Sequence, residues 1–207
     1  MQLYRLLACL LLLGSAAAQT GDLPARLLQT GDVIFIGQTG SWADIAAQAS
    51  VGDKRYGHVG IAIANGSDWS VIDAGGSPTS PDARVASKSL NEFLGHAALV
   101  GIYRPTFPSR QIPAMTAKAK DAAIARLPFD RGFSLDTEDQ IYCTELVWQA
   151  LSAAVGKDAV PVKTQWEGRA VITLEDLSLS PHLQPVAELV RYDYLPSLYT
   201  PPLKGSP

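Results

Sequence analysis

Two apolar runs on either side of Asn65-Gly66 constrain the fold of this chain more than any other feature. The runs are "HVGIAIA" at residues 58–64 and "WSVIDAG" at residues 69–75. An Asn-Gly pair between two such runs is a strong hairpin signal, because both residues tolerate the left-handed backbone of a tight turn. The sequence therefore predicts two antiparallel strands, with His58 at the start of the first and Asp73 within the second.

The remaining patterns predict strands early in the chain and helices later. Without a regular alternation of strands and helices, they favour an α+β domain with a mostly antiparallel sheet. Expected strands cover residues 30–37 ("TGDVIFIG"), 97–105 ("AALVGIYRP") and 189–194 ("LVRYDY"), and expected helices cover residues 41–49, 113–127 and 143–156.

The first 18 residues have the layout of a secretory signal peptide. Arg5 precedes an apolar run at residues 6–13, and small residues with an A-x-A site at residues 16–18 follow. A membrane-spanning helix needs about 20 apolar residues, so this run is short for an uncleaved anchor, which is the alternative. We expect residues 1–18 to be removed and residues 19–207 to form one exported domain, periplasmic or secreted, without a stable transmembrane segment.

Charge and motif spacing exclude several classes of function. The net charge of −3 and the pI near 5.6 argue against nucleic acid as a partner. The sequence has no C-x-x-C, H-x-x-x-H or H-E-x-x-H spacing and no phosphate-binding glycine loop. We therefore expect neither a metal ion nor a cofactor.

Cys143 is the only cysteine outside the expected signal peptide, which contains Cys9. An odd cysteine in an exported protein indicates a reactive thiol or a pairing between chains, whereas a buried apolar residue is the structural alternative. If a helix begins at Cys143, its unpaired N–H groups and its dipole favour the thiolate. Cys143 also precedes Leu146 by three residues, so a place in the core remains open.

A thiolate nucleophile needs a base, and the chain has three histidines. His58 begins an apolar strand, where it can face a cleft at the edge of the sheet, while His96 and His182 lie in a turn and a loop. Asp73 would orient the base if its carboxylate pairs with the imidazole of His58, because burying an unpaired carboxylate is costly. An exposed carboxylate at the end of the strand is the alternative.

Four segments together resemble a known family. "TGDVIFIG", "YGHVGIAIA", "PFD" and "IYCTELVWQAL" are similar to the circularly permuted papain-like cysteine hydrolases of the YiiX type. These are relatives of the NlpC-like cell-wall peptidases and, more distantly, of the lecithin:retinol acyltransferase group. The resemblance spans roughly residues 30–186. It implies a permuted papain-like fold, in which an antiparallel sheet packs against helices and the catalytic cysteine begins a helix.

The resemblance also implies roles for individual residues. Cys143 matches the nucleophile and His58 the general base, in the permuted order with the histidine first. Asp73 falls where the family usually has a glutamate or a similar polar group, and its side chain is one methylene shorter than that of glutamate. Gly31-Asp32 matches a "GD" pair, which we expect to shape the cleft.

The function implied is that of an exported cysteine hydrolase acting on an amide through an acyl-enzyme. A peptide or an amino-acid amide is the expected substrate, with cell-wall peptides as one candidate class. A lipid acyl hydrolase or acyltransferase, with a lipid-containing substrate, is an alternative that an extended apolar groove would favour. An inactive binding module is another, but the presence of both Cys143 and His58 argues against it.

Overall fold

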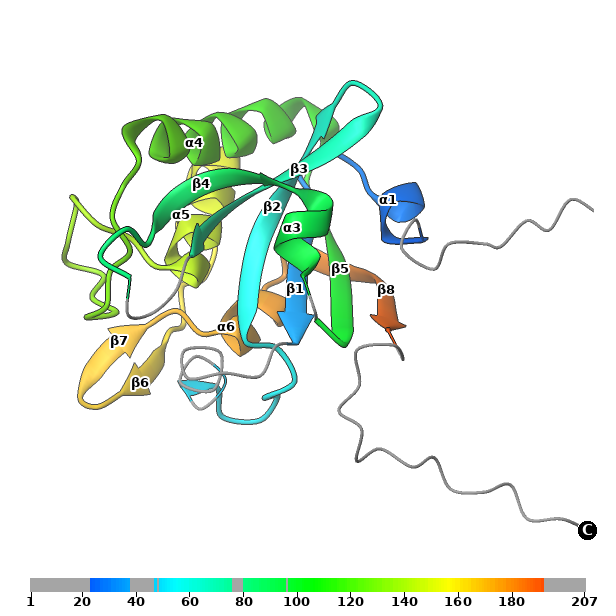
Figure 1. Cartoon of the computed structure of the whole chain (residues 1–207). Coiled ribbons are helices and arrows are strands. Elements are labelled where there is room, and N and C mark those ends of the chain that lie inside the picture. Colours follow the sequence, from blue (N-terminus) through cyan, green and yellow to red (C-terminus); the bar gives the residue numbers. More distant parts are fainter. Residues whose placement is uncertain (1–22, 38–46, 48, 76–79, 96, 192–207) are drawn as a thin grey trace, which may run out of the picture.

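The computed structural model describes residues 23–37, 47, 49–75, 80–95 and 97–191. In this part of the chain the main sheet has six strands, in the order β4-β3-β2-β1-β5-β8, and every pair is antiparallel (Figure 1). The expected α+β fold with an antiparallel sheet is confirmed. The strands are β1 (Val33–Gly37), β2 (His58–Asn65), β3 (Asp68–Gly75), β4 (Arg84–Ser89), β5 (Leu99–Pro105) and β8 (Leu183–Val190).

The hairpin around Asn65-Gly66 forms as predicted. β2 and β3 pair from Ile61 opposite Ile72 to Asn65 opposite Asp68. Gly66 has a φ of 64°, the left-handed conformation that this turn requires. The hairpin places His58 at the open end of the sheet, on a strand next to the one that carries Asp73.

β1 is one of the two central strands, and all four residues 33–36 have no exposed surface. Both of its faces are covered, which explains why its sequence is a continuous apolar run rather than an alternating one. On one face, Val33 and Phe35 belong to the larger hydrophobic cluster, which contains residues of α4 and α5. On the other face, Ile34 and Ile36 belong to a smaller cluster with residues of α3.

The helices lie on both sides of the sheet. α4 and α5 cover one face and α3 lies against the other (Figure 1). The two long predicted helices are confirmed, since α4 ends at Ala125 and α5 begins at Cys143 and ends before Gly156. The described helices are α1 (Leu23–Leu27), α3 (Leu90–Leu94), α4 (Ile112–Ala125), α5 (Cys143–Val155) and α6 (Leu174–Ser178), with a 3₁₀ turn at Ser109–Gln111.

Several elements were not expected from the sequence. β4 and α3 follow β3, and a small hairpin of β6 (Thr164–Trp166) and β7 (Arg169–Val171) precedes α6. The last strand begins at Leu183 rather than Leu189 because it tolerates Pro185 as an edge strand of the sheet. Residues 192–194 of the expected strand lie outside the described part, as do residues 41–46 and 48 of the expected helix at 41–49.

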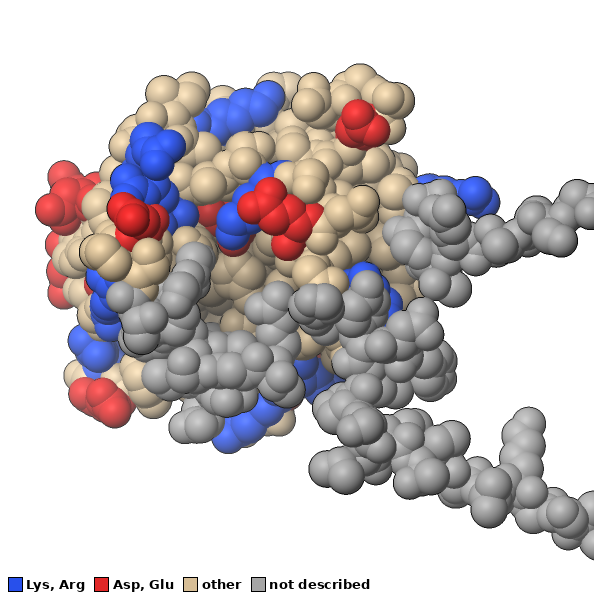
Figure 2. All heavy atoms as spheres, in the orientation of Figure 1, with Lys and Arg blue, Asp and Glu red and all other residues tan. Residues whose placement is uncertain are grey.

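The surface carries charges of both signs. Figure 2 shows acidic and basic side chains close together on one face, between larger areas of uncharged residues. The described residues displayed there thus form no extended region of one sign. Within the described ranges, no helix is both long enough and apolar enough to cross a membrane.

Candidate active site

Cys143 is the first residue of α5, and its side chain is buried. Its two neighbours in the chain, Tyr142 and Thr144, are both hydrogen-bonded to the backbone of Ile172. Thr144 donates a hydrogen bond from Oγ1 to the carbonyl oxygen of Ile172, at 2.6 Å, and the N–H of Ile172 donates to Oη of Tyr142, at 2.9 Å. These bonds hold the sulfur at the helix start, where the first N–H groups have no partner within the helix.

His58 and Asp73 form a direct pair. Nε2 of His58 lies 2.8 Å from Oδ2 of Asp73, and the Asp73 side chain is 1% exposed against 18% for His58. Asp73 is therefore a buried, paired carboxylate and not an exposed residue at a strand end. Because Nε2 is bound to Asp73, Nδ1 is the ring nitrogen of His58 that can exchange a proton with the sulfur of Cys143.

The electrostatics of the pair favour the charged forms. Burial lowers the pKa of His58, but the negative charge of Cys143 and hydrogen bonds with Asp73 and Cys143 outweigh this effect and raise it to about 10. Burial raises the pKa of Asp73, but the hydrogen bond with His58 and the charges of His58 and Lys88 hold it below its usual value. These interactions favour the protonated imidazole of His58 at neutral pH.

Three further residues complete the surroundings of this pair, and sequence reasoning missed all of them. Nζ of Lys88, on β4, lies 2.8 Å from the same Oδ2 of Asp73. The ring of Phe93, on α3, lies 5.6 Å from the imidazole of His58. A Cβ atom on Gly75 would lie 2.5 Å from Oδ2 of Asp73 and 3.1 Å from Nε2 of His58, so the pair needs a residue without a side chain there.

The other two histidines do not join this cluster in the described structure. His182 precedes β8, at the opposite edge of the sheet from β4, and its carbonyl oxygen accepts a hydrogen bond from the N–H of Thr106. His96 lies outside the described residues. Of the two candidate bases that the structure describes, His58 is the one that interacts with Cys143.

The Gly31-Asp32 pair does not shape the cleft, contrary to expectation. Asp32 is buried and receives two hydrogen bonds from Arg104, at 2.9 and 2.8 Å. It lies before β1, where its carbonyl oxygen accepts a hydrogen bond from Ala62, whereas His58 is opposite Ile36 at the other end of that strand. At about 3.3 Å per residue, four residues of β2 separate Ala62 from His58 by roughly 13 Å. The pair is a structural anchor.

Tyr142 and Glu145, which match the family motif, stabilise the start of α5. Oε2 of Glu145 accepts a hydrogen bond from the N–H of Tyr142, at 3.4 Å, and Oε1 accepts one from Gln149, at 3.0 Å. Burial raises the pKa of Glu145 to about 7. Its carboxyl group therefore takes up a proton near neutral pH, two residues from Cys143.

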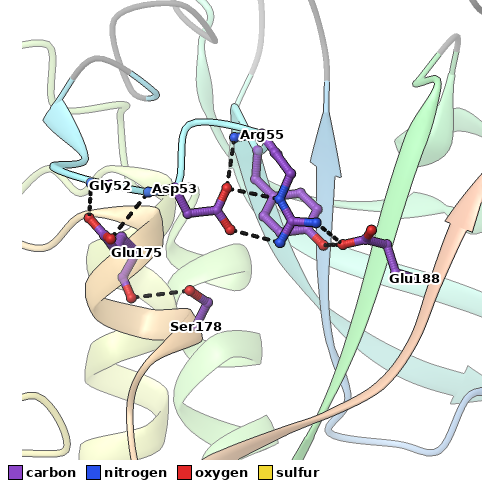
Figure 3. A network of polar contacts seen from close by, with 7 residues as sticks. Gly52, Asp53, Arg55, Glu175, Ser178 and Glu188 are labelled. Carbon is purple, nitrogen blue, oxygen red and sulfur yellow. Dashed lines mark hydrogen bonds and ion pairs between the residues drawn. The ribbon is translucent and has the colours of Figure 1, made fainter.

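The loop that leads into His58 is held by a polar network (Figure 3). The carboxylate of Glu175, on α6, accepts hydrogen bonds from the three N–H groups of residues 51–53, at 2.8 to 3.1 Å. Arg55 binds Asp53 in the same loop and also Glu188 on β8. These contacts fix the chain before β2 on both sides, so they determine where His58 begins its strand.

A pocket opens beside Cys143. Its volume is about 350 Å³, the part open to solvent included, and most of its lining is apolar. The ring of Phe133 contacts those of Tyr142 and Trp166 in T-shaped arrangements, at 5.3 and 6.1 Å between centroids. The walls include Phe133, Tyr142, Thr144, Trp166, Val171 and Ile172.

A buried cysteine at a helix start, a histidine and an acid that binds this histidine have the composition of a thiol hydrolase site. The comparison with protein families agrees. The model of the permuted papain-like amidase enzymes, YaeF/YiiX, C92 family, matches residues 27–186. The chain belongs to this family and is a cysteine hydrolase. The matched range agrees closely with the span expected from the sequence motifs.

A solved structure supports the fold. The metalloprotein YiiX from Escherichia coli O157:H7 matches with a TM-score of 0.63 and 22% sequence identity, over 79% of this chain and 98% of the other. At this identity the likeness establishes the permuted papain-like fold alone. A comparison with curated proteins found no match.

The neighbour is described as a metalloprotein, but the described residues of this chain contain no group of three or more His, Cys, Asp or Glu that could hold a metal ion.

Proposed function

We propose that this protein is an exported amidase that cleaves a peptide or an amino-acid amide through an acyl-enzyme on Cys143. His58 is the general acid and base, and Asp73 orients it. The observation that carries the proposal is the bond between Nε2 of His58 and Oδ2 of Asp73, which leaves Nδ1 for the sulfur. Export is supported by the signal-like first 18 residues of the sequence.

In the first half of the reaction, the thiolate of Cys143 attacks the carbonyl carbon of the amide, and the electron pair of the C=O bond moves to the oxygen. The backbone N–H of Cys143 donates to this oxyanion, since the first N–H groups of a helix have no partner within the helix. The imidazolium of His58 gives its Nδ1 proton to the amide nitrogen, and the C–N bond breaks. The amine leaves, and a thioester remains on Cys143.

In the second half, neutral His58 takes a proton from water, and the oxygen of this water attacks the thioester. The carboxylic acid leaves, and the thiolate and the imidazolium are restored. Asp73 remains ionised throughout and stabilises each imidazolium through Nε2.

The pocket beside Cys143 supports a substrate with one compact apolar group near the attacked carbonyl. The volume of about 350 Å³ includes space open to solvent, so the enclosed room beside Cys143 is small. Its aromatic and aliphatic walls suit an apolar amino-acid side chain. They give less support to a long lipid chain, which needs an extended groove. Cell-wall peptides fit both the exported location and an amide substrate.

A substrate panel tests this proposal. Fluorogenic amides of Ala, Leu, Phe, Lys and Glu and a long-chain acyl ester are offered to the wild type and to Cys143→Ala, and mass spectrometry records acyl adducts. We expect hydrolysis of the apolar amides, an adduct on Cys143, and no turnover by Cys143→Ala. Preference for the long-chain ester would instead support a lipid hydrolase. The absence of any adduct on Cys143 would contradict the proposal.

A further inference from the structure

The Asp73 carboxylate binds two cationic side chains through one oxygen. Oδ2 lies 2.8 Å from Nε2 of His58 and 2.8 Å from Nζ of Lys88, whereas Oδ1 is buried and has no hydrogen-bond partner among the described residues. The Asp73 side chain is 1% exposed. Lys88 and His58 therefore share the same acceptor atom in a buried place, so any change at Lys88 acts directly on the partner of His58.

Lys88 lies on β4, an edge strand of the sheet, but its side chain has an unusual orientation for such a position. Lysines on edge strands commonly point into solvent and prevent pairing with another chain. Lys88 differs, because its side chain is only 24% exposed and its ammonium group lies on a buried carboxylate. It is opposite Val71 in the register of β3 and β4, two residues from Asp73, and reaches along the sheet to it. Withdrawing an ammonium group from water is costly, so this orientation needs a compensating interaction.

Charge balance indicates what the interaction does. The reactive form of the site contains two negative groups, Cys143 and Asp73, and two positive groups, His58 and Lys88. Each comes from a different element, α5, β3, β2 and β4 respectively. Without Lys88 these side chains would carry a net negative charge in a largely buried place. This favours the uptake of a proton by the thiolate of Cys143 or the carboxylate of Asp73.

The other neighbours cannot replace this charge. α3 presents the uncharged ring of Phe93 to His58. On α5, Glu145 is acidic, and its carboxyl group is buried with Tyr142 and Gln149. Among the described groups that face the pair, Lys88 is therefore the positive charge that balances Asp73 when His58 balances Cys143.

We propose that Lys88 is a positioning residue of the reaction, which acts through Asp73 to keep that carboxylate ionised and directed at His58 and to favour the thiolate form of Cys143. The proposal rests on the proposed function, since it assigns Lys88 a part in the chemistry of Cys143. Lys88 touches neither the sulfur nor the imidazole in this role. It holds Oδ2 in place. It also supplies a second positive charge beside that of His58, because Asp73 and the thiolate of Cys143 are two buried negative groups.

The test compares Lys88→Met, Lys88→Gln and Lys88→Arg in the full chain. Iodoacetamide labelling of Cys143 is followed from pH 5 to 9, and the Cys143 peptide is quantified by mass spectrometry. Removing a nearby positive charge raises the pKa of neighbouring groups, so Met and Gln shift the labelling profile to higher pH. At pH values well below the pKa of the thiol, a shift of half a unit or more lowers the rate by about threefold or more. Arg retains the charge and restores the wild-type profile. Gln retains a hydrogen-bond donor, so it separates the effect of the charge from that of the hydrogen bond.

Two controls isolate the effect. Lys157→Met removes an exposed lysine beyond the far end of α5 and leaves the profile unchanged. In an Asp73→Asn background, Lys88→Gln has no further effect, because the coupling between Lys88 and the thiol passes through Asp73.

The outcomes separate this inference from the proposed function. Profiles of Lys88→Met and Lys88→Gln that superimpose on the wild type overturn the inference, even if both variants melt at a lower temperature. A wild-type Cys143 that labels like an ordinary thiol contradicts the proposed function instead. If the wild-type thiol is reactive but its labelling profile does not change in the Lys88 variants, the inference alone is contradicted.

Discussion

Nε2 of His58 and Oδ2 of Asp73 lie 2.8 Å apart across two neighbouring strands, at the end of the sheet where α5 begins with Cys143. The hydrogen bond selects the ring orientation of His58, because Nε2 is occupied and Nδ1 remains. The reactivity of the thiol should therefore depend on residues that never touch it.

Asp73→Asn tests this dependence. The substitution keeps the size of the side chain but removes the charge that stabilises the imidazolium of His58. We expect labelling of Cys143 by iodoacetamide, at pH values well below the wild-type pKa of the thiol, to fall by about tenfold, in line with the loss of about one pKa unit of stabilisation for the charged pair. Asp82→Asn is the matched control, because Asp82 is 84% exposed and pairs with Arg84 at the surface. Equal losses in both variants would show that Asp73 has no particular role.

Gly75→Ala tests the space that the pair requires. An added Cβ atom would lie 2.5 Å from Oδ2 of Asp73, so the carboxylate must move away from His58. We expect a several-fold lower rate of Cys143 labelling at neutral pH. Gly66→Ala is the control: Gly66 has a φ of 64° and no neighbour within 4 Å of an added Cβ, so this change strains a distant turn without touching the site.

The cost of the left-handed conformation makes Gly66→Ala less stable by roughly 1 kcal/mol, while its labelling rate stays at the wild-type level. Thermal unfolding measures the first effect and alkylation the second. Normal labelling in Gly75→Ala would mean that the contact between His58 and Asp73 does not control the thiol.

Glu145→Gln tests a pH dependence of the free energy of unfolding. Burial raises the pKa of Glu145 from 4.5 to about 7 in the folded state, so the folded chain holds this proton more tightly than the unfolded chain. The stabilising effect is fully present below pH 4.5 and is lost as the pH rises through about 7. Glutamine has no such proton to lose.

Denaturant unfolding at pH 5 and pH 8 checks this sign. Relative to the wild type, we expect Glu145→Gln to gain about 1–3 kcal/mol in unfolding free energy between the two pH values. Glu138→Gln, a change at an exposed acid, should show no such difference. A relative loss of stability on going to pH 8 would contradict the assignment.

Local signals explain what the sequence could predict. The Asn65-Gly66 turn fixes the pairing of β2 with β3, and hence brings Asp73 to His58. The stop at Gly156 and the apolar face of α5 fix the helix that Cys143 begins. In these cases the residues that determine the structure are neighbours in the chain.

Lys88 and Phe93 could not be found in this way. β4 has the sequence "RVASKS", with a single fully buried apolar residue, Val85, and α3 is only five residues long. Their roles depend on pairing with β3 and on packing against His58, which no local pattern encodes. The "GD" pair failed for a related reason, since the partner of Asp32 is Arg104, 72 positions further along the chain.

The central claim is that His58 keeps Cys143 in a reactive form, and the pH dependence of Cys143 alkylation tests it most directly. The rate is measured from pH 5 to 9 in the wild type, in His58→Ala, and in His182→Ala as the matched control. The account predicts fast labelling of the wild type and of His182→Ala already near pH 6. It predicts that His58→Ala follows an ordinary cysteine, which ionises near pH 8.5 or so. Superimposed profiles of the wild type and His58→Ala, both rising only toward about pH 8.5, would contradict it.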